Sequence, residues 1–168
     1  DVIDSSLLYF LNSVLKRIYN SHILCIAAMN GACLGGGLEI SLACHLRLAS
    51  ENAMVGLPET SIGIIPGLGG FHRMRALIGE AKALELVLMG DIISAQRASE
   101  LHLINKIFPK RDFKQTCIEY VKSIMNTKPQ CINEVVKLNK CMRNNVLDDN
   151  SMTDLTIDSF LKLIKSNE

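Results

Sequence analysis

The order of apolar and polar residues predicts that the chain opens with a helix followed by a buried strand. Between Leu7 and Ile18, apolar residues recur at steps of three and four, which places them on one face of a helix that Asp4 or Ser5 could cap. Residues 23–29 then form an unbroken apolar run closed by Asn30-Gly31. Such a run before a turn dipeptide is typical of a buried strand.

A cluster of three glycines, Gly35 to Gly37, separates this strand from an apolar segment at 38–44. Glycines are costly inside a helix but suit a sharp turn at its start, so we expect a turn followed by a helix. Residues 46–49 and 53–56 predict two further short strands. The prolines and glycines between residues 58 and 70 indicate an irregular stretch.

The second half of the chain is predominantly helical by pattern. We expect helices over 71–89 and 95–101, the latter capped by Ser94, and a last strand at 105–108. Three apolar stripes with helical spacing follow: Phe113, Cys117, Tyr120, Val121 and Ile124; Ile132, Val135, Val136 and Met142; Ile157, Phe160, Leu161 and Ile164. These stripes predict a helical layer that packs on the α/β part or on a partner subunit.

Composition narrows the class of protein. The chain has 168 residues, of which 48% are hydrophobic and 21% charged, and this excludes a disordered protein. The net charge of +1 gives no general basic surface for nucleic acid or membrane. No apolar run reaches the ~18 residues that a membrane-spanning helix needs. The six cysteines form no C-x-x-C pair, so we interpret them as buried thiols of a reducing compartment rather than disulfides or zinc ligands.

The glycine turn is the first candidate for chemistry. A helix that begins at a glycine turn offers free N–H groups at its positive end, which suits a phosphate or a developing oxyanion. The plain alternative is a tight turn with close packing. The dinucleotide motif G-x-G-x-x-G, the Walker motif and G-x-S-x-G are all absent, so an oxyanion site is the better functional interpretation.

Two acidic residues lie beside the glycine-rich segments. Glu39 falls in the first turn of the helix after Gly37, among apolar neighbours, and Glu59 follows the apolar segment that ends at Pro58. If they share a cleft, they can divide the roles of general base and general acid. Otherwise they are a helix-start acid and a solvated strand-end acid.

The remaining polar residues point to no further site. The four histidines (His22, His45, His72 and His102) lack metal-ligand spacing, so we expect ordinary surface or core hydrogen bonds and no metal. Arg47, Arg73 and Arg75 have no spacing that predicts a phosphate site, and Lys106, Lys110 and Arg111 are interpreted as a solvated edge.

Four ordered segments resemble the crotonase (enoyl-CoA hydratase/isomerase) family. Residues 26–39, IAAMNGACLGGGLE, resemble its I-A-A-x-N-G-x-x-x-G-G-G-x-E motif, and 54–59, MVGLPE, resemble F-G-x-P-E. Residues 63–70, GIIPGLGG, resemble G-x-x-P-G-x-G-G, and 90–98 resemble G-x-x-I-x-A-x-x-A. The form of residues 37–44 is most similar to the branch that holds methylglutaconyl-CoA hydratase, the AU-rich-RNA-binding member.

The resemblance implies an α/β fold, with a partial spiral of β-β-α turns over 1–108 and a C-terminal helical assembly region over 109–168. It implies hydratase activity on an acyl-CoA thioester of fatty acid metabolism, with Glu39 and Glu59 as the catalytic carboxylates. The Gly36 N–H would be an oxyanion donor and the Gly67 N–H would help to place the water. CoA belongs to the substrate, so no separate cofactor is expected. A homotrimer or hexamer without membrane contact is expected as well.

Some positions depart from the family pattern. His45 stands where the family usually has Asp, and Phe71-His72 stands where it usually has Thr-Gln, so the hydrogen bonds around them are expected to differ. The chain begins at Asp1 without the loop A-x-A-D-I/L, which gives the second oxyanion N–H, and ends without the helix after E-G-x-x-A-F. We therefore expect it to be part of a longer polypeptide and nearly inactive alone.

Two other interpretations stay open. The chain could be a truncated, non-catalytic homologue that acts in assembly, or it could bind RNA as the nearest branch does. The sequence leaves the organelle open between mitochondrion and cytoplasm, and it leaves the acyl-chain preference open.

Overall fold

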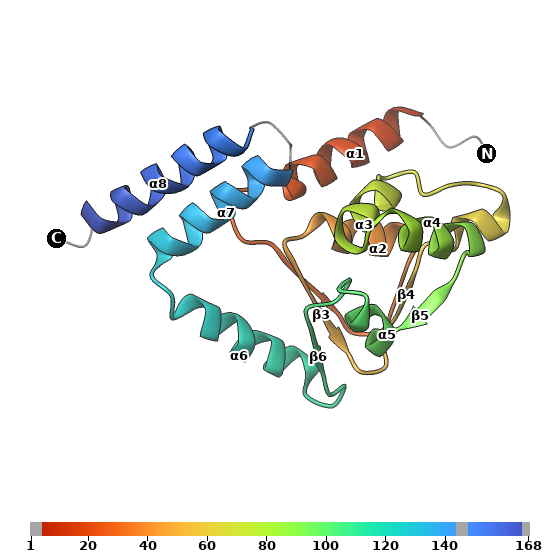
Figure 1. Cartoon of the computed structure of the whole chain (residues 1–168). Coiled ribbons are helices and arrows are strands. Elements are labelled where there is room, and N and C mark those ends of the chain that lie inside the picture. The colour runs from red at the N-terminus through yellow and green to blue at the C-terminus, as the bar shows by residue number, and fades with distance from the viewer. Residues whose placement is uncertain (1–4, 144–147, 166–168) are drawn as a thin grey trace. The chain divides into compact units, whose positions relative to one another are not determined.

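The computed structural model describes residues 5–143 and 148–165 (Figure 1). In chain order the elements are α1 (Ser5–Tyr19), β1 (Ile26–Met29), β2 (Ala32–Leu34), α2 (Gly36–Ala43), β3 (Leu46–Ser50), β4 (Met54–Gly56), the 3₁₀ helix η1 (Pro58–Ile62), α3 (Gly70–Ile78), α4 (Glu80–Met89), β5 (Ile92–Ser94), α5 (Ala95–Glu100), β6 (Lys106–Phe108), α6 (Phe113–Met125), α7 (Pro129–Arg143) and α8 (Asp149–Lys165). The suggested cap Asp4 lies outside the described residues.

The strands form two small sheets that repeat a β-β-α pattern. In one, β1, β3 and β6 pair in parallel, with Ile26 opposite Leu46; in the other, β2 and β4 pair in parallel, with Leu34 opposite Gly56, and β5 joins antiparallel to β4. β1 and β2 lead into α2, while β3 and β4 lead into η1 and α3. Two β-β-α turns therefore stack with strand on strand, which confirms the predicted α/β spiral.

The chain divides into two compact units, and the first carries the spiral. It consists of the described residues up to Tyr19 together with Cys25–Glu119. Its core is built from aliphatic side chains and methionine, as a chain without tryptophan requires: Met29, Leu38, Leu42, Ala49, Ala53, Val55, Leu57, Met74, Ala83, Leu86, Val87, Ala95, Ala98, Leu103 and Ile104. Helix α2 contributes two of its most completely buried residues, Leu38 and Leu42. This packing fixes the start of α2 against the sheets.

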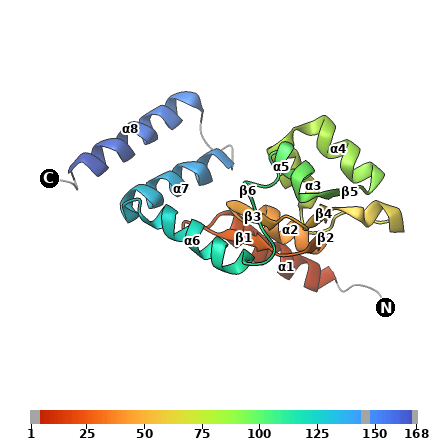
Figure 2. The same cartoon turned by 90° about the horizontal axis from the view of Figure 1, so that it is seen from below.

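The second unit consists of Asn20–Leu24 and the described residues from Tyr120 onward. Within it α7 and α8 lie side by side, as Figures 1 and 2 both show. Several apolar residues of the predicted stripes are exposed in the single chain: Val135, Met142, Ile157, Phe160, Leu161 and Ile164. The role of residues 109–168 as an assembly region stays a prediction.

The structure corrects several sequence-based boundaries. The helix expected over 71–89 is two helices, because Gly79 interrupts it with a φ of +82°. Strands β2 and β5 were not expected, since three residues are too few to establish an alternating pattern. The predicted cap of α5 is confirmed, as Ser94 Oγ accepts a hydrogen bond from the Arg97 N–H at 3.2 Å.

All six cysteines are free thiols; Cys44 and Cys117 are buried, and the other four are only partly buried. Within residues 5–143 and 148–165, no cluster of His, Cys, Asp and Glu has the make-up of a metal site. No helix in those same ranges combines the length and apolarity of a membrane span.

Candidate active site

The turn from β2 into α2 places Glu39. Gly35 has a φ of +52°, a conformation that glycine adopts without a steric cost, and its N–H donates to the Gly56 carbonyl at 2.9 Å. Helix α2 begins at the next residue, and the Glu39 N–H donates to the Gly35 carbonyl at 3.0 Å. Glu39 therefore lies in the first turn of α2, where its side chain is only 2% exposed.

Residues 67–70, here called the amide loop, hold the Glu39 carboxylate. Its Oε1 accepts hydrogen bonds from the N–H of Leu68 at 2.8 Å and of Gly70 at 2.7 Å. Burial raises the pKa of Glu39 above its ordinary value; the two amides and the Arg73 charge act in the opposite direction, and the Glu59 charge raises it further. Glu39 therefore holds its proton to a higher pH than an exposed glutamate does.

Glu59 comes from the next turn of the spiral and meets the same helix start. It lies in the first turn of η1, directly after β4. Its Oε1 is 3.2 Å from the position that a Cβ on Gly35 would take, and its charge acts on Glu39. Its Oε2 is buried and makes no hydrogen bond with the described residues. The structure thus brings both predicted carboxylates together at the N-terminus of α2.

The two predicted glycines, Gly36 and Gly67, lie in the two segments around Glu39, the start of α2 and the amide loop. Gly36 is the first residue of α2, and the first N–H groups of a helix have no acceptor within the helix. Gly67 opens the amide loop, and its carbonyl accepts from Asn12 Nδ2 at 3.0 Å. The amides that contact Glu39 belong to Leu68 and Gly70, which the sequence had not singled out. In the sequence, the glycines between residues 67 and 70, just before a predicted helix, were the feature that could have indicated these amides.

Arg73, for which the sequence predicted no site, borders the amide loop. Its Nη1 donates to the Leu68 carbonyl at 2.6 Å, and its guanidinium lies 5.4 Å from the centre of the Tyr19 ring. Arg47 is buried and donates to the carbonyls of Leu103 and Cys44. Both arginines thus bond to the protein's own carbonyls.

His45, which departs from the family pattern, has a structural role. It is buried, and its Nδ1 accepts from the Cys25 N–H at 2.9 Å while its own N–H donates to the Cys25 carbonyl at 2.8 Å. It therefore fixes the chain just before β1. This confirms the expectation of a core hydrogen bond at this histidine.

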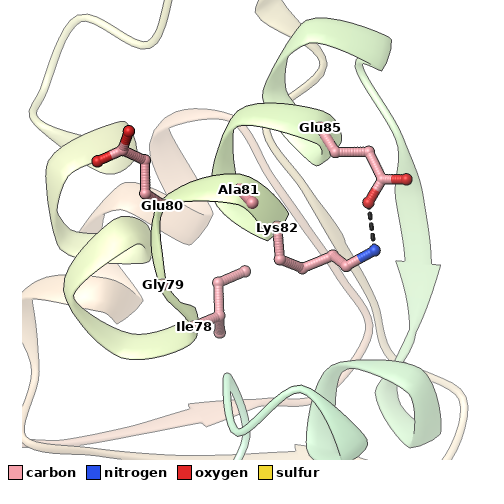
Figure 3. Close-up of a pocket in the computed structure, with 6 residues that line it drawn as sticks. All are labelled: Ile78, Gly79, Glu80, Ala81, Lys82 and Glu85. Carbon is pink, nitrogen blue, oxygen red and sulfur yellow. Dashed lines mark hydrogen bonds and ion pairs between the residues drawn. The ribbon is translucent and has the colours of Figure 1, made fainter.

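A separate surface depression lies where α3 meets α4 (Figure 3). It is lined by Ile78, Gly79, Glu80, Ala81, Lys82 and Glu85. Lys82 pairs with Glu85, and Glu80 pairs with Arg75. None of the four predicted site residues lines it, so the candidate active site is distinct from this depression.

Comparison with known proteins bears on the family and the fold. Residues 9–167 match the model of the enoyl-CoA hydratase/isomerase family. The solved enoyl-CoA hydratase from Bacillus anthracis superposes with a TM-score of 0.88 at 30% identity, covering 98% of this chain and 64% of that chain. The crotonase-like fold is thereby confirmed.

Curated relatives carry related names. The fatty acid oxidation complex subunit alpha of Shewanella amazonensis is 35% identical over 92% of this chain and 22% of that protein. A protein of Bacillus subtilis, named as a probable enoyl-CoA hydratase, is 48% identical over 55% of this chain and 36% of that protein. The chain spans well under two thirds of the length of these relatives. By its family match and its fold, the chain belongs to the enoyl-CoA hydratase/isomerase family.

Proposed function

We propose that the protein to which this chain belongs is an enoyl-CoA hydratase, which adds water in syn fashion across the double bond of an α,β-unsaturated acyl-CoA thioester. The observation that carries the proposal is the convergence of two carboxylates, Glu39 and Glu59, on the N-terminus of α2. Hydration of an enoyl thioester requires a base for water, an acid for the α-carbon and a group that stabilises the enolate oxygen. This part of the chain offers a candidate for each.

Glu39 is the proposed base. The amide loop engages its Oε1 through two hydrogen bonds, which orient the carboxylate, and its Oε2 is the oxygen proposed to take the proton from water. As Glu39 takes a proton, the water oxygen bonds to the β-carbon and the double-bond electrons move to the thioester oxygen, forming an enolate. The burial that raises the pKa of Glu39 also makes it a stronger base than an exposed carboxylate, provided that it is ionised.

Glu59 is the proposed acid, and Gly36 the proposed oxyanion donor. The protonated Glu59 carboxyl gives its proton to the α-carbon as the enolate collapses, and the product leaves as the 3-hydroxyacyl thioester. Glu39 then releases its proton to solvent and Glu59 takes one up from solvent, which restores both groups. The buried, unbonded Oε2 of Glu59 and the helix-start position of the Gly36 amide support these roles.

The test uses the natural full-length protein that contains these residues. Hydration of crotonyl-CoA is followed by the loss of enoyl-thioester absorbance. We expect Glu39→Gln and Glu59→Gln to lower kcat by about 10²–10⁴-fold, because each removes a general acid or base. The matched control is Glu119→Gln, an exposed residue of α6 whose carboxylate accepts a hydrogen bond from Gln115, and it should leave kcat unchanged.

Equal turnover by wild type and Glu59→Gln would contradict the acid role. Full activity of Glu39→Gln would contradict the base role. Assembly as a homotrimer or hexamer, RNA binding and the non-catalytic alternative stay untested predictions.

A further inference from the structure

The amide loop is held from two sides by side chains that do not themselves touch Glu39. Asn12 Nδ2 of α1 donates to the Gly67 carbonyl at 3.0 Å, and Arg73 Nη1 of α3 donates to the Leu68 carbonyl at 2.6 Å. The N–H groups of Leu68 and Gly70 in this loop donate to the Glu39 carboxylate. Each peptide unit is planar, so anchoring its carbonyl also sets the direction of the next N–H. Asn12 thus sets the direction of the Leu68 N–H. Arg73 holds the next peptide, Leu68–Gly69, which lies between the two amides that bond Glu39 and joins them.

The contact between Arg73 and the loop is tight. A Cβ on Gly69 would lie 3.0 Å from Arg73 Nη1 and 2.7 Å from His72 Cε1. Gly69 also has a φ of +83°, so its conformation excludes most other residues. A side chain at position 69 would therefore collide with His72 and Arg73, and a shorter side chain at position 73 would lose the hydrogen bond to the Leu68 carbonyl.

Arg73 is also a buried cation. The residue is 5% exposed, and its guanidinium packs on Tyr19 of α1. Anchoring one carbonyl requires only a neutral donor, whereas burying a charge is costly unless other groups compensate for it. The Arg73 charge acts electrostatically on the Glu39 carboxylate and lowers its pKa.

We propose that Arg73 is a positioning residue for Glu39: by holding the Leu68 carbonyl, it keeps the amides of Leu68 and Gly70 directed at the Glu39 carboxylate and keeps that carboxylate ionised. The catalytic meaning of this inference rests on the proposed function, but the effect on the ionisation of Glu39 does not. Asn12 supports the same loop without contributing a charge.

Two other ionisable groups face this cluster. Glu59 of η1 raises the pKa of Glu39, opposing Arg73. His72 of α3 lies beside Gly69, and burial together with the Arg73 charge lowers its pKa, so it adds little positive charge at neutral pH. The cation that acts on Glu39 in this cluster is therefore Arg73.

The test is an NMR titration of the Glu39 side-chain carboxyl carbon in the 168-residue chain, with Glu39→Gln to assign the signal. We expect Arg73→Met to raise the pKa of Glu39, since it removes an opposite charge and loosens the loop whose two amides lower that pKa more strongly than the charge does. Arg73→Lys, which keeps the charge but not the planar fork, should raise it by less. Asn12→Ala should speed hydrogen exchange at the Leu68 and Gly70 amides with a smaller pKa change.

The control is Arg75→Met, two residues along the same helix, where the arginine is exposed and paired with Glu80. It should leave the Glu39 titration unchanged. A folded Arg73→Met whose Glu39 titrates within about 0.2 units of wild type would overturn the proposal, because a lost neighbouring charge shifts a pKa by more. If Arg73→Met does not fold, Arg73→Lys decides: an unchanged titration with unchanged amide exchange overturns the proposal.

In the full-length enzyme, the acidic limb of the kcat/KM profile should move upward by the same amount as the titration. A purely structural role would lower activity without moving that limb. Absence of hydratase activity would contradict the proposed function but would not change the titration result. Failure of the proposed function and failure of the positioning role of Arg73 are therefore distinguishable.

Discussion

At the scale of single residues, the candidate site depends on glycines that leave room for carboxylates. A Cβ on Gly70 would lie 2.7 Å from Glu39 Cγ and 2.9 Å from its Oε1, and a Cβ on Gly35 would lie 3.2 Å from Glu59 Oε1. The first distance is shorter than real Cβ contacts, and the Glu39 side chain cannot withdraw because the Gly70 amide itself holds it. A side chain at position 70 would therefore collide with the carboxylate that the backbone amide of the same residue holds.

We therefore expect Gly70→Ala to destabilise the chain by about 1–3 kcal/mol, the usual cost of overpacking a filled site, although alanine favours helices. Urea unfolding followed by circular dichroism measures the change. Gly31→Ala is the control, since a Cβ there meets nothing within 4 Å, and it should change stability by less than about 0.5 kcal/mol. Equal effects of the two substitutions would show that the crowding at Gly70 is relieved cheaply.

The sequence allowed part of this site to be predicted, and the reason is local. Glu39 and Glu59 each lie next to a glycine or proline turn within a short motif of the family that the sequence resembles, and their shared site was an implication of that resemblance. The contribution of Arg73 did not, because the segments that make it, α1, the amide loop and α3, meet only in the folded chain. An arginine near a loop carries no signature of the carbonyl that it will contact.

At the scale of elements, the pair α7–α8 is joined by a buried carboxylate. Glu134 of α7 accepts from Ser159 Oγ at 3.0 Å and from Lys162 Nζ, both on α8. These two hydrogen bonds, that from Lys162 first, lower the pKa of Glu134 below its ordinary value. Helical spacing predicted both helices correctly, but polar residues between them gave no sign that they would bond across the pair.

We expect Glu134→Gln to speed amide hydrogen exchange in α8 by about two- to fivefold at pH 7, as for the loss of a partly exposed ion pair. Asp154→Asn, an exposed acid of α8, is the control and should have no effect. Because the pKa of Glu134 is lowered on folding, its contribution to folding stability is present at pH values above its ordinary pKa of 4.5. That contribution is lost as the pH falls through the lower pKa of the folded state. Wild type and variant should therefore converge in acid; a constant difference down to low pH would contradict this account.

At the scale of the whole first unit, Arg47 connects parts that are distant in sequence. It projects from β3, and its Nε donates to the Leu103 carbonyl at 2.6 Å and its Nη1 to the Cys44 carbonyl at 3.0 Å. Its backbone N–H also donates to Asn105 Oδ1 at 2.8 Å. The end of α2, the central strand and the approach to β6 therefore meet at one buried side chain.

Arg47→Met should cost about 2–6 kcal/mol, because it leaves two buried carbonyls without their donor at about 1–3 kcal/mol each. Arg75→Met removes an arginine whose ion pair with Glu80 is exposed and should cost less than about 1 kcal/mol. The urea midpoints of the two variants and wild type measure the difference. Similar midpoints for the two variants would contradict the linking role of Arg47.

The parallel pairing of β2 with β4 has a consequence for how the chemistry of this chain can be altered. Leu34 lies opposite Gly56 just ahead of the two segments that carry Glu39 and Glu59. Neighbouring strands keep a spacing of about 4.8 Å whatever their side chains. The strand pairing therefore sets the separation of the segments that carry the two acids. One acid can be replaced by another functional group while the other keeps its position.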